Sequence, residues 1–510
     1  MSAIEPVLAG MYPDPSVCRV GADCYLVTST FEYFPGVPIF HSRDLVRWHQ
    51  IGHVLTRRSQ LDLRGVASSR GIFAPTLRYC DGTFWMITTH VERGNFVVIA
   101  EDPAGPWSEP IWIDEQGIDP SLAFLDGRIY YTRTGPGSDA DHPFIYQTEL
   151  EWSEARDQLV ATSEPRVIWK GTGGIWAEAP HLYRRGAHYY LLTAEGGTSY
   201  DHSVVVARSA QPYGPFTASP HGPLLTHRNA PDHPVQATGH ADWVELEDGS
   251  TWAVLLGIRA AGGRHHHLGR ETFVSSLRWD DDGWPRMGSG GLLEPREAPA
   301  GAGEAERDDF DSARLGPEWV FVRNPDSRDW SLGERPGHLR LWGSELTLSD
   351  AGSPALVCRR QGRFDASVRT LVDFDPQQPG EQAGLCVRAN EDFHLTLLIA
   401  RVDGRRQLAL SETLGGSTRT VAVCELGDGP VTLALRASRR HYTASGGTGA
   451  NLRELGSVPV QSLSAETIRA RTGRDSFTGV MLGLLATGTG RRSGAPADFD
   501  WFEYTAGPEK

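Results

Sequence analysis

The chain has 510 residues, which predicts more than one domain, and its apolar share of 39% supports sizeable cores. The formal net charge of −15 argues against nucleic acid or an anionic membrane surface as a partner and favours a neutral substrate. The sequence has no apolar stretch long enough to span a membrane and no secretion signal at its start, so we expect a cytoplasmic protein. The six cysteines show no C-x-x-C pair and are expected to be reduced thiols in buried strands.

A short motif recurs through residues 1–296, and each copy is followed by a turn and an aromatic strand. The copies lie at residues 12–16, 74–77, 118–121, 178–182 and 239–243. The strands that follow lie at residues 25–28, 84–87, 130–131, 189–192 and 252–255. A repeat of this kind indicates stacked or radially arranged units, and the spacing suits blades of four short strands. Because no segment shows sustained helical periodicity, we predict a five-bladed β-propeller over residues 1–296.

The composition changes after the last copy of the motif. Residues 297–307 are small, acidic and turn-rich, which predicts a linker. Residues 308–510 are rich in strands but lack the repeated motif, and their length suits a β-sandwich of the jelly-roll, concanavalin-like kind. The predicted fold class is therefore all-β. In this second domain the clearest strands lie at residues 339–342, 366–374 and 394–399, and a short helix is expected near residues 466–469.

Three acidic residues stand at corresponding points of the repeat, namely Asp14, Asp119 and Glu178. Side chains at equivalent points of a ring converge on its axis, and convergent carboxylates are the equipment of glycoside hydrolysis. An inverting enzyme needs a general base and a general acid about 6.5–9.5 Å apart, and a third carboxylate nearby raises the pKa of the acid. An Asp before Pro commonly serves only a turn. Two such turns, with a Glu beside the equivalent third turn, favour a catalytic role.

Seven motifs in order resemble glycoside hydrolase family 43, in particular its β-xylosidase and α-L-arabinofuranosidase members with a C-terminal sandwich. They are YPDPS, STFEYFPGVPIFHSRDLVRW, GIFAPTLRY, GIDPSL, AEAPHLY, TGHADWV and HHLGRETF. The resemblance implies inversion of configuration and a pocket that removes one pentose from a chain end. It also implies that Asp14 is the general base, Glu178 the general acid, and Asp119 the residue that tunes and orients the acid. Many relatives have Gly where Ala179 stands here, a small change if the local φ is negative.

The same resemblance implies four substrate-binding residues. Arg270 matches an arginine that hydrogen-bonds sugar hydroxyls, and a surface salt bridge with Glu271 or another acid is the alternative. Phe31 and Phe73 match the aromatic walls of the pocket, although the sequence alone favours core packing for each of them. His240 matches a position that binds a calcium ion through water or stands in as a cation itself, and a satisfied core histidine is the alternative.

These observations predict an exo-acting, inverting glycoside hydrolase that releases terminal xylose from β-1,4-xylo-oligosaccharides. Side activity on terminal arabinofuranosides is expected because both sugars present similar hydroxyl geometry. The alternatives are an α-L-arabinofuranosidase and a non-catalytic carbohydrate-binding protein. We expect no required cofactor, with a calcium ion near the propeller axis as the open alternative, and a homo-oligomer is also left open.

Overall fold

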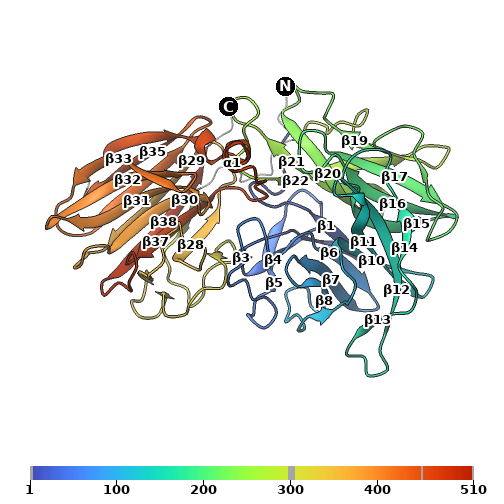
Figure 1. Ribbon diagram of the computed structural model, residues 1–510, viewed down its shortest axis with the longest axis horizontal. Helices are drawn as coiled ribbons and strands as arrows, with labels where there is room; N and C mark the ends of the chain where they lie inside the picture. The colour runs from blue at the N-terminus through green and yellow to red at the C-terminus, as the bar shows by residue number, and fades with distance from the viewer. Residues whose placement is uncertain (1–3, 297–304, 450–451, 508–510) are drawn as a thin grey trace.

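The computed structural model describes residues 4–296, 305–449 and 452–507. Figure 1 shows two lobes, a propeller coloured blue to green and a sandwich coloured yellow to red. The predicted all-β class is confirmed, since residues 4–296 contain no helix and the second lobe is built mainly of strands. No helix in the described parts of the chain is long and apolar enough to cross a membrane.

The propeller consists of five antiparallel sheets, which are its blades. Blade I contains β1 (Ser16–Val20), β2 (Asp23–Val27), β4 (Gly36–Ser42) and β5 (His49–Leu55). Blade II contains β6 (Thr76–Cys80), β7 (Thr83–His90), β8 (Gly94–Ala100) and β9 (Ile111–Trp112). Blade III contains β10 (Ile118–Leu125), β11 (Arg128–Asp139), β12 (His142–Trp152), β13 (Leu159–Ala161) and β14 (Arg166–Trp169). Each repeated motif in these blades thus leads into a first strand.

Blade IV contains β15 (Glu178–Arg185), β16 (His188–Glu195), β17 (Ser203–Ser209), β18 (Thr217–Ala218) and β19 (Leu225–Thr226). Blade V contains β20 (Val235–Glu245), β21 (Thr251–Arg259), β22 (Glu271–Trp279) and β23 (Pro285–Met287). The second strand of every blade carries the predicted aromatic residues, which pack between blades. Tyr131 of blade III and Trp85 of blade II, for example, belong to one buried cluster. The sequence repeat therefore reports both the blades and the cores between them.

The N-terminal segment closes the ring by pairing with blade V. Leu8 and Thr272 form an antiparallel bridge, and the Tyr12 amide donates to the Arg270 carbonyl at 3.0 Å. The Thr272 hydroxyl donates back to the Tyr12 carbonyl at 2.6 Å. This closure brings the turn that carries Asp14 next to Arg270, although the two residues are far apart in the sequence.

The sandwich packs two antiparallel sheets face to face. One sheet contains β24 (Ala305–Asp308), β26 (Trp330–Ser331), β27 (Leu339–Trp342), β29 (Ala366–Asp373), β34 (Val431–Ala437), β35 (His441–Thr448), β36 (Arg453–Pro459) and β38 (Pro496–Ala506). The other contains β28 (Ala355–Arg360), β30 (Gln382–Asn390), β31 (Phe393–Val402), β32 (Arg405–Leu414), β33 (Ser417–Glu425) and β37 (Met481–Thr487). Inward-facing residues such as Val368, Leu385 and Leu433 form its core.

The predicted short helix is confirmed as α1 (Ala465–Thr472), which follows the 3-10 turn η1 (Val460–Leu463). The Ser464 hydroxyl accepts from the Thr467 amide at the N-terminus of α1, and Gly473 ends it with φ 69°. The predicted linker at residues 297–307 lies mostly outside the described residues. Its last three residues form part of β24, which pairs with β38, so the sandwich begins earlier than the composition indicates.

The two lobes share a strand pair and an apolar cluster. β25 (Phe321–Val322) of the second lobe pairs with β3 (Tyr33–Phe34) of the propeller. Tyr33 and Met11 of the propeller are buried with sandwich residues such as Cys358 and Met481. The cysteines form no disulfide, and four of the six are buried. The strand pair and this apolar cluster therefore hold the sandwich against the propeller.

Candidate active site

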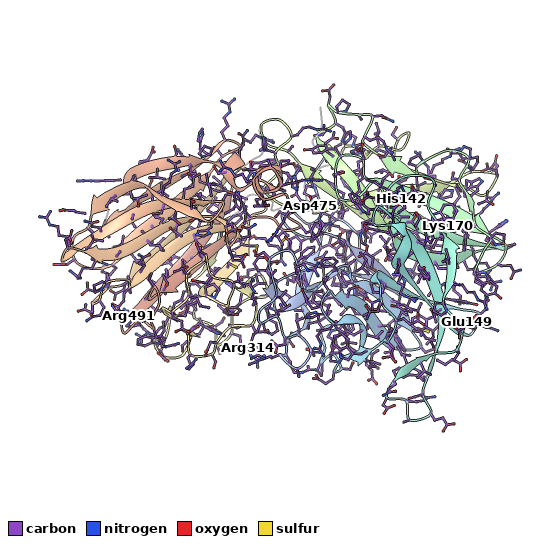
Figure 2. All side chains as sticks on the ribbon, viewed as in Figure 1. His142, Glu149, Lys170, Arg314, Asp475 and Arg491 are labelled. Atoms are coloured by element: carbon purple, nitrogen blue, oxygen red, sulfur yellow. The ribbon has the colours of Figure 1, made fainter. Side chains whose placement is uncertain are left out.

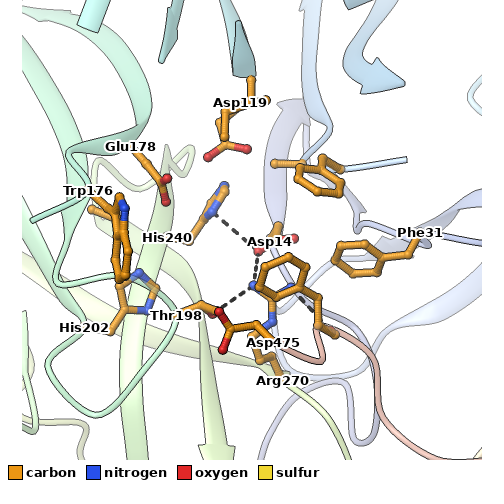
Figure 3. A pocket seen from close by; sticks show the side chains of 16 residues that line it. Asp14, Phe31, Asp119, Trp176, Glu178, Thr198, His202, His240, Arg270 and Asp475 are labelled. Atoms are coloured by element: carbon orange, nitrogen blue, oxygen red, sulfur yellow. Dashed lines mark hydrogen bonds and ion pairs between the residues drawn. The ribbon is translucent and has the colours of Figure 1, made fainter. Parts of the chain in front are cut away.

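A cavity of about 240 Å³ lies at the propeller axis and reaches the interface with the sandwich. All seven residues predicted to form the site line it, namely Asp14, Phe31, Phe73, Asp119, Glu178, His240 and Arg270. Figure 3 shows the three acidic side chains near one another, with the His240 ring between them in this view. Asp14, Asp119 and Glu178 lie far apart in the sequence, but they meet at one cavity, as the repeated motif predicts.

Backbone irregularities just before or within the first strands of the blades aim these side chains inward. Asp14, Asp119 and His240 have positive φ values of 56°, 50° and 47°. The strand register shifts between Ile118 and Ser121, and corresponding shifts occur in blades IV and V. Bulges of this kind re-aim side chains beside active sites, and repeating the device around the ring makes the carboxylates converge.

Ala179 also lies in the left-handed region, with φ 53°. From the sequence, we expected the extra methyl group of Ala179 to be a small change if the local φ is negative. The observed φ is positive, so this condition is not met. A non-glycine residue in this conformation carries strain, and a glycine would adopt it more easily. The Ala179 amide works to lower the pKa of the Asp119 carboxyl group, against the larger effect of burial, which raises it.

Asp14 is buried but is surrounded by groups that favour its ionised form. Arg270 Nη1 donates to Asp14 Oδ1 at 2.9 Å, Ser29 donates its hydroxyl to Oδ2, and His240 Nδ1 lies 3.5 Å from Oδ1. Burial works to raise the pKa of Asp14, but Arg270, His240 and the Ser29 hydrogen bond outweigh it and hold that pKa below its usual value. Asp14 is therefore a carboxylate at neutral pH.

Glu178 has the opposite environment. Burial, followed by the negative charges of Asp119 and Asp14, raises the pKa of Glu178 to about 8, and Arg270 opposes this only in part. Burial also raises the pKa of Asp119, together with the charge of Asp14, against the opposing charges of His240 and Arg270. Carboxyl groups with pKa values pushed apart in one site are suited to serve as base and acid.

Arg270 and three phenylalanines form one side of the cavity. The Arg270 guanidinium also donates to Thr198 Oγ1 at 3.1 Å, whereas Glu271 pairs with Arg259. Arg270 does pair with an acid, but this acid is the buried Asp14 of the cavity and not a residue of the surface. The Phe31 and Phe73 rings are 5.5 Å apart at their centroids and pack against each other as well as lining the cavity. Both interpretations of these two rings are therefore correct.

The third ring comes from the sandwich. Phe477 stacks on Phe31 with centroids 5.9 Å apart and meets Phe73 edge-on at 6.0 Å. Asp475 from the same segment also lines the cavity, and Figure 2 shows it between the two lobes. The sandwich therefore contributes Phe477 and Asp475 to the pocket wall.

The described residues around His240 offer few oxygen atoms that could bind a calcium ion directly. Calcium prefers six to eight oxygen ligands. Near His240 the closest carboxylate is that of Asp14, which already accepts hydrogen bonds from Arg270 and Ser29. Among the described residues, the one group of three side chains that could hold a metal lies elsewhere, at His221, Asp280 and Asp282.

Several lining residues were missed at the sequence level. They include Trp176, Thr198, His202, Asp475 and Phe477. Trp176 lies two residues before Glu178 and packs against Gly197, where a Cβ atom would come within 2.1 Å of its ring. Trp176 and Gly197 both lie in glycine-rich stretches, and these stretches were the sequence feature that could have indicated a role for Trp176. No sequence signal connects Phe477 to the propeller motifs.

Asp242 also escaped notice, although the motif at residues 239–243 contains it. Its carboxylate is fully buried and accepts hydrogen bonds from Arg78 Nη1 at 2.7 Å, from the Ser16 hydroxyl and from the Tyr183 hydroxyl. Although burial opposes it, the charge of Arg78 helps to hold the pKa of Asp242 well below its usual value. These contacts tie blades I, II, IV and V together at the axis, so Asp242 serves the architecture that positions the acids.

A propeller whose axis carries an ionised carboxylate, a protonated carboxyl group and an arginine defines a glycoside hydrolase. The sequence profile of glycosyl hydrolases family 43 matches residues 4–285, and that of the beta xylosidase C-terminal concanavalin A-like domain matches residues 307–505. The chain belongs to glycosyl hydrolases family 43. The predicted family and fold are thereby confirmed, and the idea of a non-catalytic binding protein loses its support.

Relatives match over nearly the whole chain. The chain is 42% identical to a non-reducing end alpha-L-arabinofuranosidase of Bacteroides ovatus, with 98% of this chain and 94% of the relative covered. It is 34% identical to a beta-xylosidase of Bacillus subtilis, with 99% of each covered. Among solved structures, a xylan beta-1,4-xylosidase from Bacillus halodurans has 36% identity and a TM-score of 0.90, with 99% of this chain and 100% of that chain covered.

Proposed function

We propose that the protein is an exo-acting, inverting hydrolase that releases terminal xylose from β-1,4-xylo-oligosaccharides and also cleaves terminal α-L-arabinofuranosides. The observation that carries this proposal is the contrast between Asp14 and Glu178 on the wall of one cavity. Asp14 is held ionised by Arg270, while the pKa of Glu178 is raised to about 8. A base and an acid are therefore both ready at neutral pH.

In the proposed reaction the Asp14 carboxylate takes a proton from water as that water attacks the anomeric carbon. Glu178 gives its proton to the glycosidic oxygen on the opposite side, and the carbon–oxygen bond breaks. The released sugar has inverted configuration, and exchange with solvent returns a proton to Glu178 and removes one from Asp14. Burial is the main cause that keeps Glu178 protonated, and the charge of Asp119 adds to it.

The size of the cavity supports exo action on a single terminal sugar. Its volume of about 240 Å³ is below the roughly 300–1,000 Å³ of pockets for drug-sized ligands. Phe31, Phe73 and Phe477 provide apolar faces for a sugar ring, and Arg270 provides guanidinium donors for adjacent hydroxyls. His240 lies beside Asp14 and helps to lower the pKa of Asp14, and no step in this mechanism passes through a metal ion.

The second candidate is an enzyme whose main substrate is the arabinofuranoside. It is favoured by the 42% identity to the arabinofuranosidase of Bacteroides ovatus, which exceeds the 34% identity to the beta-xylosidase of Bacillus subtilis. Both sugars are neutral pentoses that the same acids, arginine and aromatic rings can hold. The discrimination between them depends on the shape of the pocket walls.

Rates on nitrophenyl β-xyloside and nitrophenyl α-L-arabinofuranoside test the proposal. We expect hydrolysis of both, with the higher kcat/KM on the xyloside, and release of xylose one unit at a time from xylotetraose. A clear preference for the furanoside would replace our first candidate with the second. Cleavage of xylotetraose to xylobiose as the initial product would contradict exo action.

A further inference from the structure

The segment that carries Phe477 has no regular secondary structure, although its ring forms part of the pocket wall. It lies between α1 and β37, and residues 474–480 belong to neither helix nor strand. Contacts with the propeller hold it instead. The Phe477 amide donates to Ser69 Oγ at 3.0 Å, and the Val480 amide donates to the His267 carbonyl at 2.8 Å.

Ser69 is itself held rigidly in the propeller. It is 8% exposed and has φ 60°, and its amide donates to Oε2 of Glu32 at 2.9 Å. Glu32 is fully buried and follows Phe31 directly in the sequence. One short hydrogen-bonded path therefore connects Phe477 through Ser69 to the residue beside Phe31, on which the Phe477 ring stacks.

The path continues into the sandwich through a buried charge. Arg388 Nη1 of β30 donates to Glu32 Oε1 at 3.4 Å, and its Nη2 donates to the Ser68 hydroxyl at 3.0 Å. Ser68 in turn donates to Glu391 at 2.6 Å. Ser68 thus belongs to the charged part of the interface, whereas Ser69 contacts the pocket-forming segment. The adjacent residues Ser68 and Ser69 therefore contact different parts of the sandwich.

We propose that Ser69 is a positioning residue of the sugar pocket, whose hydroxyl fixes the backbone of Phe477 and so keeps the Phe477 ring against Phe31. Ser69 does not line the cavity and acts only through Phe477. The Ser69 hydroxyl of the propeller thus positions Phe477, which is the residue by which the sandwich contributes to the sugar-binding wall. The kinetic part of this inference rests on the proposed function, whereas the structural part does not.

Kinetics on the preferred nitrophenyl glycoside give the first test. Loss of one hydrogen bond in Ser69→Ala should raise KM about three- to tenfold, with kcat nearly unchanged. Ser69→Gly should behave alike, and it removes the hydroxyl without backbone strain at φ 60°. Ser68→Ala is the matched control, because it loses hydrogen bonds of the same interface without touching Phe477, and its KM should stay near that of the parent.

A double-mutant cycle with Phe477→Ala shows whether Ser69 acts through that ring. Ser69→Ala should raise KM in the parent but add nothing in the Phe477→Ala background. An equal increase in both backgrounds, or an equal effect of Ser68→Ala, would overturn the proposal. A merely structural loss would instead lower the melting temperature of both serine variants without this pattern in KM.

Hydrogen exchange gives a readout that does not depend on the substrate. Exchange of the peptide covering residues 474–480 should accelerate in Ser69→Ala and Ser69→Gly and stay unchanged in Ser68→Ala. Unchanged exchange in both Ser69 variants would overturn the proposal. If the parent protein hydrolyses neither glycoside, the proposed function fails, and the exchange measurement still decides whether Ser69 anchors Phe477.

Discussion

Arg270 and Asp14 are joined by a hydrogen bond of 2.9 Å at the seam where the propeller ring closes. The same seam is fastened by the backbone bond from the Tyr12 amide to the Arg270 carbonyl. The closure of the fold and the ionisation of the proposed base thus depend on one contact region. Since Arg270 also faces the cavity, the residue that would bind the sugar also lowers the pKa of Asp14.

Replacing Asp14 tests the proposed base. Asp14→Ala should lower kcat by about 10²–10⁴-fold, the usual contribution of a general base. Calorimetry should show that xylose still binds, because Arg270 and the aromatic walls remain. Asp126→Ala, which removes an exposed aspartate from a hairpin of blade III, is the control and should keep full activity. Normal turnover in Asp14→Ala would remove this residue from the mechanism.

The pH dependence of kcat/KM should be bell-shaped. The acidic limb reports protonation of Asp14, whose pKa lies below its usual value. The basic limb reports loss of the proton from Glu178, whose pKa is about 8. Activity requires Asp14 without its proton and Glu178 with it, so the rate falls on both sides of the plateau. A basic limb near the ordinary pKa of a glutamate would contradict the assignment.

Asp119→Asn should move only the basic limb. Burial is the largest cause of the raised pKa of Glu178, and the charge of Asp119 is the next. Removing that charge lowers the pKa of Glu178, so the limb shifts to lower pH, while burial keeps it above the value of a free glutamate. A pH titration of kcat/KM measures this, and a limb that stays in place would show that Asp119 does not tune the acid.

Ala179→Gly tests the strain at the site. Relative to Ala177→Gly, a matched change at a neighbouring buried alanine without positive φ, it should destabilise the protein by about 1 kcal/mol less. Urea unfolding of both variants gives the comparison, and activity should be retained in Ala179→Gly. Equal destabilisation of the two variants would mean that the left-handed backbone at Ala179 costs nothing.

Chelation tests the inference that no calcium ion takes part. After dialysis against EDTA, the rate should equal that of the untreated enzyme, and added calcium should not raise it. His240→Ala provides the companion measurement, because loss of its charge should raise the pKa of Asp14 and shift the acidic limb upward. Activity that disappears with EDTA and returns with calcium would restore the metal interpretation of His240.

The repeated motif was sufficient to predict the blades and the convergence of Asp14, Asp119 and Glu178. Its period follows from the fold itself, since each blade needs the same turn and the same inward-facing strand. An Asp before Pro commonly indicates a turn. An alanine before Pro gives no such indication, so the positive φ of Ala179 could not be predicted from the sequence. The start of β24 was obscured by a polar composition, since this edge strand of the sandwich is largely exposed.

Phe477 could not be found from the sequence for a different reason. Its place in the pocket depends on how a separate domain packs, through the pairing of β3 with β25 and the burial of Tyr33. No periodicity within one domain reports a contact between two domains. Asp242, by contrast, lay inside a recognised motif, and only the coordinates distinguish its architectural network with Arg78 from a place in the site.

The most direct test of the account is to follow the anomeric configuration of the first product by proton NMR during hydrolysis of a β-xyloside. Attack by a water that Asp14 activates, on the face opposite the proton from Glu178, predicts that α-xylose appears first and later equilibrates to the β anomer. Initial release of β-xylose would indicate a covalent intermediate on the enzyme and would contradict the roles assigned to Asp14 and Glu178.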